Sequence, residues 1–122
     1  MSCNIFKGKC NCCKHLAIVT SATIKNNQLI LQVPEKSYVN GEMVCFLIAQ
    51  NLPISYEPIP VIVKVGETNE YFLFNRNGNY IYSDQIRSRQ IYSTQYRTDT
   101  KAFKYCGYRR LQNTRFVFGT MY

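Results

Sequence analysis

The sequence contains few residues that could carry acid–base chemistry. Its 122 residues include one histidine, His15, and seven acidic residues, which are scattered among turns and basic segments. General acid–base catalysis needs titratable groups held within hydrogen-bond reach of a substrate, and no local pair of such groups is visible. The motifs of serine hydrolases, zinc proteases, P-loop NTPases and dinucleotide-binding proteins are also missing. We therefore expect that the protein is not an enzyme.

Long apolar runs are missing as well. No stretch reaches the roughly 18 consecutive apolar residues that cross a bilayer, and the N-terminus lacks the apolar core of a secretion signal. We therefore expect no membrane contact and a protein made and kept in a cytoplasm. Thiols stay reduced in that compartment, so the six cysteines are expected to be thiols or metal ligands rather than disulfides.

Helical periodicity is scarce, whereas β-branched and aromatic residues alternate along much of the chain. The dipeptides Asn26–Asn27 and Asn77–Gly78 tolerate the left-handed conformations of tight hairpin turns. The near-continuous apolar run over residues 43–49 predicts a central strand buried on both faces. The proline-rich residues 51–60 predict an extended surface connection. The pattern as a whole predicts an all-β domain, either a sandwich or a partly open barrel.

We expect one small domain over residues 16–122 after a cysteine-rich leader over residues 1–15. Within the domain, residues 76–115 are rich in arginine and tyrosine. A period of two places Tyr92 and Tyr96 on one strand face and several arginines on the other, and neither is a clean core face. This segment is therefore predicted to be a long arm or edge strand that binds a neighbouring subunit, or a long surface hairpin.

The leader contains the segment "KGKCNCCKH", in which a C-x-x-C pair could hold one metal ion across a tight turn. The candidate ligands of a single structural zinc are Cys3, Cys10, Cys13 and His15. Cys12 is an alternative third thiolate, and Cys106 could supply a ligand from the far end of the chain. Two other interpretations remain open, namely a tail that binds no metal and a redox centre.

The net charge is +8 and it is uneven. Residues 1–60 have five lysines and three acidic residues, or +2, whereas residues 61–122 have ten Lys or Arg and four acidic residues, or +6, and contain all seven arginines. The candidate partner-binding residues are Arg76, Tyr80, Tyr82, Arg87, Arg89, Tyr92, Tyr96, Arg97, Arg109 and Arg110. Tyrosine and arginine are enriched at protein interfaces, but they also bind single-stranded nucleic acids in small barrels of the OB or SH3-like type. Periodicity does not separate these two functions.

The order of sequence features resembles a known class of small virion proteins. The leader "CNCCKHL" is followed by a strand pair, by "YVNGEMVCFLIAQNLP", "PVIVKVG" and "NRNGN", and by the Arg/Tyr tail. This layout is similar to that of proteins encoded near the capsid genes of tailed bacteriophages of gut bacteria, some of which are auxiliary or decoration proteins. The resemblance implies a β-rich structural protein, present in many copies, that binds major capsid or neck subunits. It would be located in the virion, and in the host cytoplasm during assembly. The resemblance implies no role for any particular residue.

Overall fold

The computed structural model describes residues 14–110 and shows an all-β domain, as predicted. Its strands are β1 (His15–Ile18), β2 (Ser21–Lys25), β3 (Gln28–Val33), β4 (Met43–Ile48), β5 (Val61–Val65), β6 (Asn69–Phe74), β7 (Gln90–Arg97) and β8 (Ala102–Arg110). A short 3-10 helix, η2 (Ser83–Gln85), precedes β7. No helix in this part of the chain is long and apolar enough to span a membrane.

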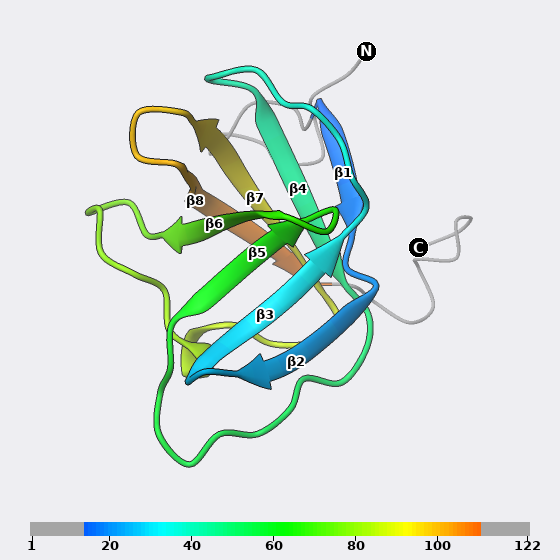
Figure 1. The fold of residues 1–122 in the computed structure, drawn as a ribbon, viewed down its shortest axis with the longest axis vertical. Helices are drawn as coiled ribbons and strands as arrows, with labels where there is room; N and C mark the ends of the chain where they lie inside the picture. Colours follow the sequence, from blue (N-terminus) through cyan, green and yellow to red (C-terminus); the bar gives the residue numbers. More distant parts are fainter. Residues whose placement is uncertain (1–13, 111–122) are drawn as a thin grey trace.

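The eight strands form one sheet in the order β1-β4-β7-β8-β6-β5-β3-β2. Its two edge strands, β1 and β2, are consecutive in the chain and are separated only by Val19 and Thr20. Val19 N donates to Leu47 O at 3.0 Å, and Thr20 N donates to Gln32 O at 2.8 Å. One bent segment thus connects both ends of the sheet, which curls around its core (Figure 1). Of the two predicted architectures, the barrel fits this arrangement.

Two tight turns lie at the dipeptides where the sequence predicts them. The β2–β3 hairpin turns at Asn26 and Asn27, whose φ angles are 54° and 59°, as a mirror-image turn of the hairpin type requires. After β6 the chain turns again at Gly78, which has a φ of 86°. The strand that a hairpin turn at Asn77–Gly78 would lead into is reduced to isolated bridges at Tyr80 and Tyr82. The turn positions were therefore predictable, whereas the extent of pairing was not.

The core lies inside the curled sheet, where alternate strand residues are buried. β3 and β5 run in parallel and contribute Leu29, Leu31, Val33, Val61, Val63 and Val65. Phe103 of β8 is fully buried, with the rings of Phe46, Tyr38 and Tyr96 at centroid distances of 4.9, 5.8 and 5.3 Å. Aromatic rings at such separations pack favourably beyond their burial alone. They fill the part of the interior where β7 and β8 meet β4.

The Arg/Tyr-rich segment lies in the middle of the sheet. β7 pairs with β4 on one side and with β8 on the other, so the prediction of an arm or an edge strand is wrong. The alternative of a hairpin is correct, but the β7–β8 hairpin has backbone partners on both outer sides. One face of β7, with Gln90, Tyr92, Thr94 and Tyr96, is buried.

Candidate functional site

The histidine pairs with a nearby carboxylate. His15 Nε2 lies 2.9 Å from Glu42 Oε1, and the His15 ring packs edge-on against Tyr38 with a centroid distance of 5.2 Å. Glu42 also accepts a hydrogen bond from Val39 N at 2.9 Å and pairs with Lys14 at 3.0 Å. These contacts, with the Val39 bond first, lower the pKa of Glu42 from 4.5 to about 2. The cluster therefore ties the start of β1 to the segment before β4.

The predicted zinc site lies mostly outside the described residues. Cys3, Cys10, Cys13 and the alternative Cys12 all precede residue 14. Within residues 14–110, no group of three His, Cys, Asp or Glu residues could hold a metal ion. A structural zinc site needs four ligands, so His15 alone does not test the prediction, and the site stays a prediction.

Cys45 lies in β4 and is 1% exposed, as expected of a core residue. Its Sγ lies 3.4 Å from Ser93 Oγ of β7. Cys45 is also disulfide-bonded. The expectation that the cysteines stay reduced is therefore wrong for this residue.

Two of the predicted partner-binding tyrosines belong to the core. Tyr92 and Tyr96 are 5% and 9% exposed, which leaves little of either ring for a partner. The Tyr92 hydroxyl accepts a hydrogen bond from Arg87 N at 2.7 Å and donates one to Gln90 Oε1. Burial is the main cause that raises the pKa of Tyr92 to about 12. Burial of both rings in the core therefore contradicts their assignment to a binding surface.

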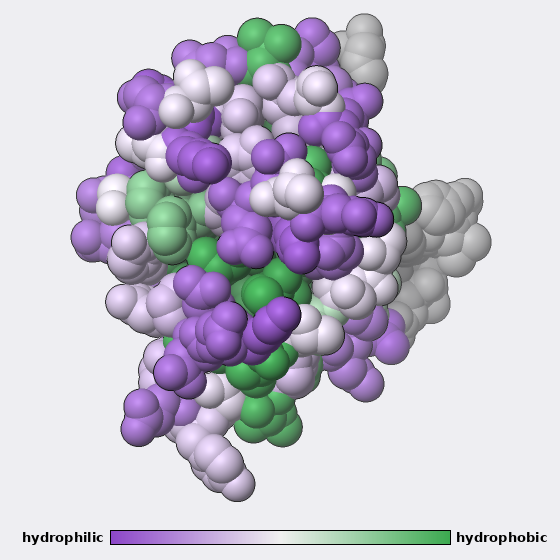
Figure 2. Space-filling view, viewed as in Figure 1, coloured by the Kyte–Doolittle hydropathy of each residue, from purple (hydrophilic) through white to green (hydrophobic). Residues whose placement is uncertain are grey.

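Three aromatic rings lie on the outside of the sheet, and we call Phe72, Phe74 and Tyr80 the aromatic patch. Phe72 and Phe74 alternate along β6 with residues that contact the core. Their rings are parallel, with centroids 6.0 Å apart. Tyr80 packs against Phe72 at 4.9 Å and against Phe74 at 5.3 Å, and it remains 41% exposed. Hydrophobic surface is visible over the end of β6 in Figure 2.

The turn after β6 carries an arginine that is held against β8. Asn75 Oδ1 accepts hydrogen bonds from Asn77 N at 2.8 Å and from Asn79 N at 3.0 Å. Arg76 follows Asn75, and its guanidinium donates to the backbone carbonyl of Cys106 in β8. Arg76 is exposed. The hydrogen bond therefore directs Arg76 towards β8, while the bridge between Phe74 and Tyr80 brings the chain after the turn back to the aromatic patch.

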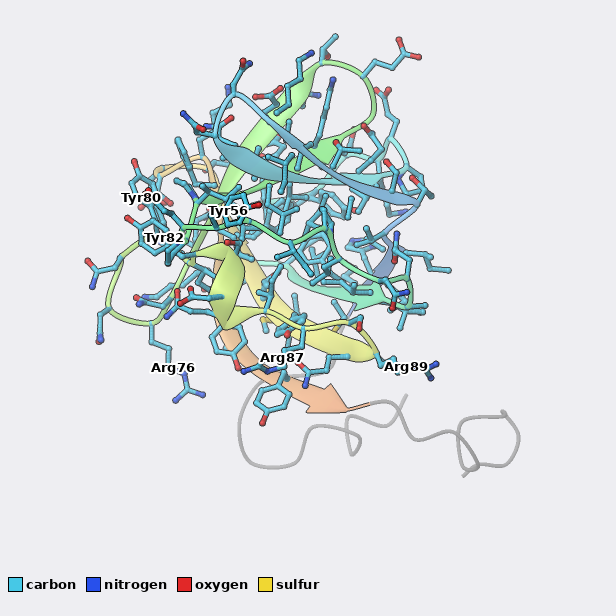
Figure 3. The ribbon with its side chains drawn as sticks, turned by 90° about the horizontal axis from the view of Figure 1, so that it is seen from below. Tyr56, Arg76, Tyr80, Tyr82, Arg87 and Arg89 are labelled. Carbon is cyan, nitrogen blue, oxygen red and sulfur yellow. The ribbon has the colours of Figure 1, made fainter. Side chains whose placement is uncertain are left out.

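Tyr80 and Tyr82 both point outward, because Ile81 between them is buried. Figure 3 shows the two tyrosines side by side on the outside of the molecule. Tyr82 is 38% exposed and lines a shallow depression that it shares with Glu57 and Asp84. The surface around Tyr82 is therefore acidic, whereas the surface around Tyr80 is aromatic.

The other exposed arginines are not gathered at one place. Arg76, Arg87 and Arg89 lie well apart in Figure 3. Arg89 adopts a φ of 63°, and its backbone N donates to Ile48 O at 2.7 Å where the chain enters β7. The structure therefore spreads these three arginines over different parts of the surface instead of gathering them into one basic patch.

The last predicted arginines lie on the β7–β8 hairpin. Arg97 is half-buried and pairs with Asp99 at 3.1 Å, so its charge is already matched within the chain. Arg109 and Arg110 end β8, opposite the first two residues of β7. The placement of the side chains of Arg109 and Arg110 is outside what the structure describes.

The connection between β4 and β5 forms a cleft that the sequence did not predict. Ile54 and Tyr56 are 92% and 106% exposed, and Ser55 Oγ donates to Glu57 O at 2.6 Å beside them. We call the space of about 890 Å³ between this connection and the chain before β7 the loop cleft. It is lined by Asn51, Leu52, Pro53, Ile54, Ser55, Tyr56, Pro58, Ser83, Asp84, Ile86, Arg87 and Ser88. Isoleucine and tyrosine between prolines were the available signal, because a solvated connection has no need of large apolar side chains.

Comparison of the chain with protein-family models, with curated proteins and with solved structures gave no match.

Proposed function

We propose that the chain is a structural protein of a tailed-phage particle, which docks on a capsid or neck subunit through the aromatic patch and Arg76. The observation that carries the docking role is the aromatic patch itself, three mutually packed rings on the outer face of a sheet. Where one face of a sheet is in water, the residues that point to that face are normally polar. Clustered apolar surface of this kind is typical of interaction sites. The layout of the sequence supplies the class of partner.

The geometry of this surface suits binding because its side chains are already ordered. Tyr80 is fixed by two neighbouring rings, and Arg76 is fixed by its bond to the Cys106 carbonyl. Ordering a flexible side chain on binding costs about 0.5–1.5 kcal/mol, and much of this is avoided here. Tyrosine and arginine are also the residue types that most often dominate interface energetics.

The overall charge fits an acidic partner surface. The chain has 15 Lys and Arg residues against seven acidic ones. Charge complementarity speeds the encounter of two proteins and fixes their orientation. A shell built from acidic subunits would attract many copies of this basic protein through charge alone.

Three features favour a protein partner over a nucleic acid. Single strands are bound along a continuous basic groove with rings free to stack on bases, but Arg76, Arg87 and Arg89 lie apart (Figure 3). The Tyr80 ring already packs against Phe72 and Phe74. The depression beside Tyr82 contains Glu57 and Asp84, whose charges would repel phosphates.

Quantitative mass spectrometry of purified particles tests the proposal. The wild-type chain is expected in particles at a fixed ratio to the major capsid protein. Tyr80→Ala and Arg76→Ala should each lower this ratio because they remove the centre and the cation of the docking surface. Lys25→Ala is the matched control, since Lys25 is exposed on the edge strand β2, which β5 and β3 separate from β6. Absence of the wild-type chain from particles, or occupancy unchanged in both variants, would refute the proposal.

A binding assay with single-stranded DNA and RNA tests the alternative. Fluorescence anisotropy at low and at near-physiological salt is expected to show weak binding that disappears as salt rises, because nonspecific attraction depends on counterion release. Tight binding at near-physiological salt that is lost in the Arg87→Ala/Arg89→Ala variant would favour the nucleic-acid-binding module instead.

A further inference from the structure

We propose that the loop cleft binds a second copy of this chain, so that Ile54 and Tyr56 of each copy enter the cleft of the other across a two-fold axis. The loop cleft is separate from the aromatic patch, and the inference does not rest on the proposed function. It rests on an exposed apolar tip, a cleft beside it that contains both apolar and polar side chains, and two opposite charges in that cleft.

The tip exposes two large side chains that a solvated loop does not need. Ile54 is 92% exposed and Tyr56 is 106% exposed. Pro53 and Pro58 flank them and fix two φ angles, while the Ser55 hydroxyl bonds to Glu57 O. A short rigid loop that presents an isoleucine and a tyrosine loses little conformational entropy when it is buried in a partner.

The cleft offers matching apolar walls. Leu52, Pro53 and Pro58 line it from the connection itself, and Ile86 lines it from the chain before β7. Ile86 is 4% exposed and belongs to the core, so this wall is rigid. The bottom view in Figure 3 shows Tyr56 and Arg87 on the same side of the molecule. A tip that lies at the edge of its own cleft can reach the cleft of a copy related by two-fold rotation.

The charges point to a second copy rather than to another partner. Asp84 and Arg87 both line the cleft, and neither forms an ion pair with any residue of the described range 14–110. In a two-fold interface, residue i of one copy contacts residue j of the other, and j contacts i. Arg87 of each copy would therefore face Asp84 of the other. A uniformly acidic partner would satisfy Arg87 but oppose Asp84, so the surface is complementary to itself.

Analytical ultracentrifugation of the full chain from micromolar to millimolar concentration tests this inference. The wild-type chain should form dimers in a concentration-dependent way, with no larger species from this surface because a two-fold interface closes on itself. Ile54→Ser and Tyr56→Ser should each raise the dimer dissociation constant by roughly tenfold or more, as expected for central interface residues. Val39→Ser is the control, because Val39 is 64% exposed on a different connection.

Charge exchange provides the sharper test. Arg87→Asp and Asp84→Arg should each weaken the dimer by about tenfold or more, and the double variant should recover most of the loss. Both side chains are exposed, and the bonds of Arg87 to Tyr92 use its backbone, so the fold is expected to survive; thermal melting by circular dichroism checks this. A chain that stays monomeric throughout, a dimer insensitive to all four single variants, or a double variant as weak as the single ones would overturn the inference. None of these outcomes bears on the particle occupancy of Tyr80→Ala.

Discussion

Tyr92→Phe removes one hydroxyl from a buried polar network where β7 begins. The hydroxyl accepts a hydrogen bond from Arg87 N at 2.7 Å and donates to Gln90 Oε1. Tyr92 and Gln90 are each 5% exposed, so water cannot readily replace the lost group. The substitution leaves one buried acceptor and one partly buried donor without this partner.

Each unsatisfied buried polar group costs about 1–3 kcal/mol. Because Arg87 N is only partly buried, water can compensate some of its loss, and we expect about 2–3 kcal/mol of lost unfolding free energy in total. Urea denaturation followed by circular dichroism measures this as a lower midpoint with an unchanged slope. A Tyr92→Phe/Gln90→Leu variant lacks both the Tyr92 hydroxyl and the Gln90 amide, so no side-chain acceptor is left unsatisfied and part of the stability should return.

Tyr108→Phe is the matched control for this prediction. Tyr108 is 55% exposed, and its ring lies 6.2 Å from that of Tyr92, so the same chemical change is made beside the network but at a residue that is largely in contact with water. It should change the unfolding free energy by less than about 0.5 kcal/mol. A Tyr92→Phe change as small as that of the control would refute the network as a source of stability.

The same hydroxyl gives a prediction in alkaline solution. Burial raises the pKa of Tyr92 from 10.0 to about 12, so between these values the folded chain keeps a proton that the unfolded chain has lost. Stability must therefore fall as the pH rises through this window. The Tyr92→Phe variant should show a shallower decline in the urea midpoint over the same range. Parallel pH profiles for the two proteins would contradict the assignment.

Gly66 and Glu42 give two further predictions. Gly66→Ala should destabilise the fold by about 2–3 kcal/mol, because a left-handed conformation disfavours a Cβ by about 1–2 kcal/mol and the new Cβ would also lie 2.7 Å from Glu35 Oε1. Gly41→Ala is the control, because Gly41 has a φ of +91° and no heavy atom within 4 Å of an added Cβ. In urea denaturation it should lose only the unfolding free energy due to the left-handed conformation. Equal losses of unfolding free energy in the two variants would exclude a contribution from the Glu35 contact. The lowered pKa of Glu42 stabilises the fold above pH 4.5, and this contribution is lost as the pH falls towards 2. The urea midpoint of the wild-type chain should therefore fall more steeply over this range than that of Glu42→Gln. Equal pH profiles of the two proteins would contradict the pKa.

The turns and buried strands were predictable because their signals are local. Asn26 and Asn27 can adopt positive φ angles at little strain, and the structure places both there. The apolar run around β4 predicts burial on both faces, and β4 is buried along nearly all of its length. Pairing across the sheet depends on residues far apart in the chain, so the order of strands and the closure through β1 and β2 could not be deduced.

The position of Tyr92 and Tyr96 was not predictable from alternation alone. A face of Gln, Tyr, Thr and Tyr looks polar, and polar faces usually lie in water. Here the polar atoms are satisfied inside the protein, as where Thr94 Oγ1 donates to Val44 O at 2.7 Å. The aromatic bodies then fill the core, and Tyr96 lies 5.3 Å from Phe103 between ring centroids. Whether such a face is a core or a binding surface is decided by partners on other strands.

The arginines were predicted as one surface because they are close in the chain, but sheet geometry separates them. Arg76 lies on the turn after β6, Arg87 on the chain before β7, and Arg97 at the β7–β8 turn, where Asp99 matches its charge. A docking surface needs side chains that lie next to one another. Such side chains are found where Phe72 and Phe74 of β6 point outward and Tyr80, after the following turn, packs against both. The run "EYFLF" contains this information in part, since apolar residues on both faces of a strand require cover on both sides. The inner side is covered by the core and Tyr80 packs over the outer side, so the outward rings of β6 are a better basis for the proposed docking surface than the count of arginines.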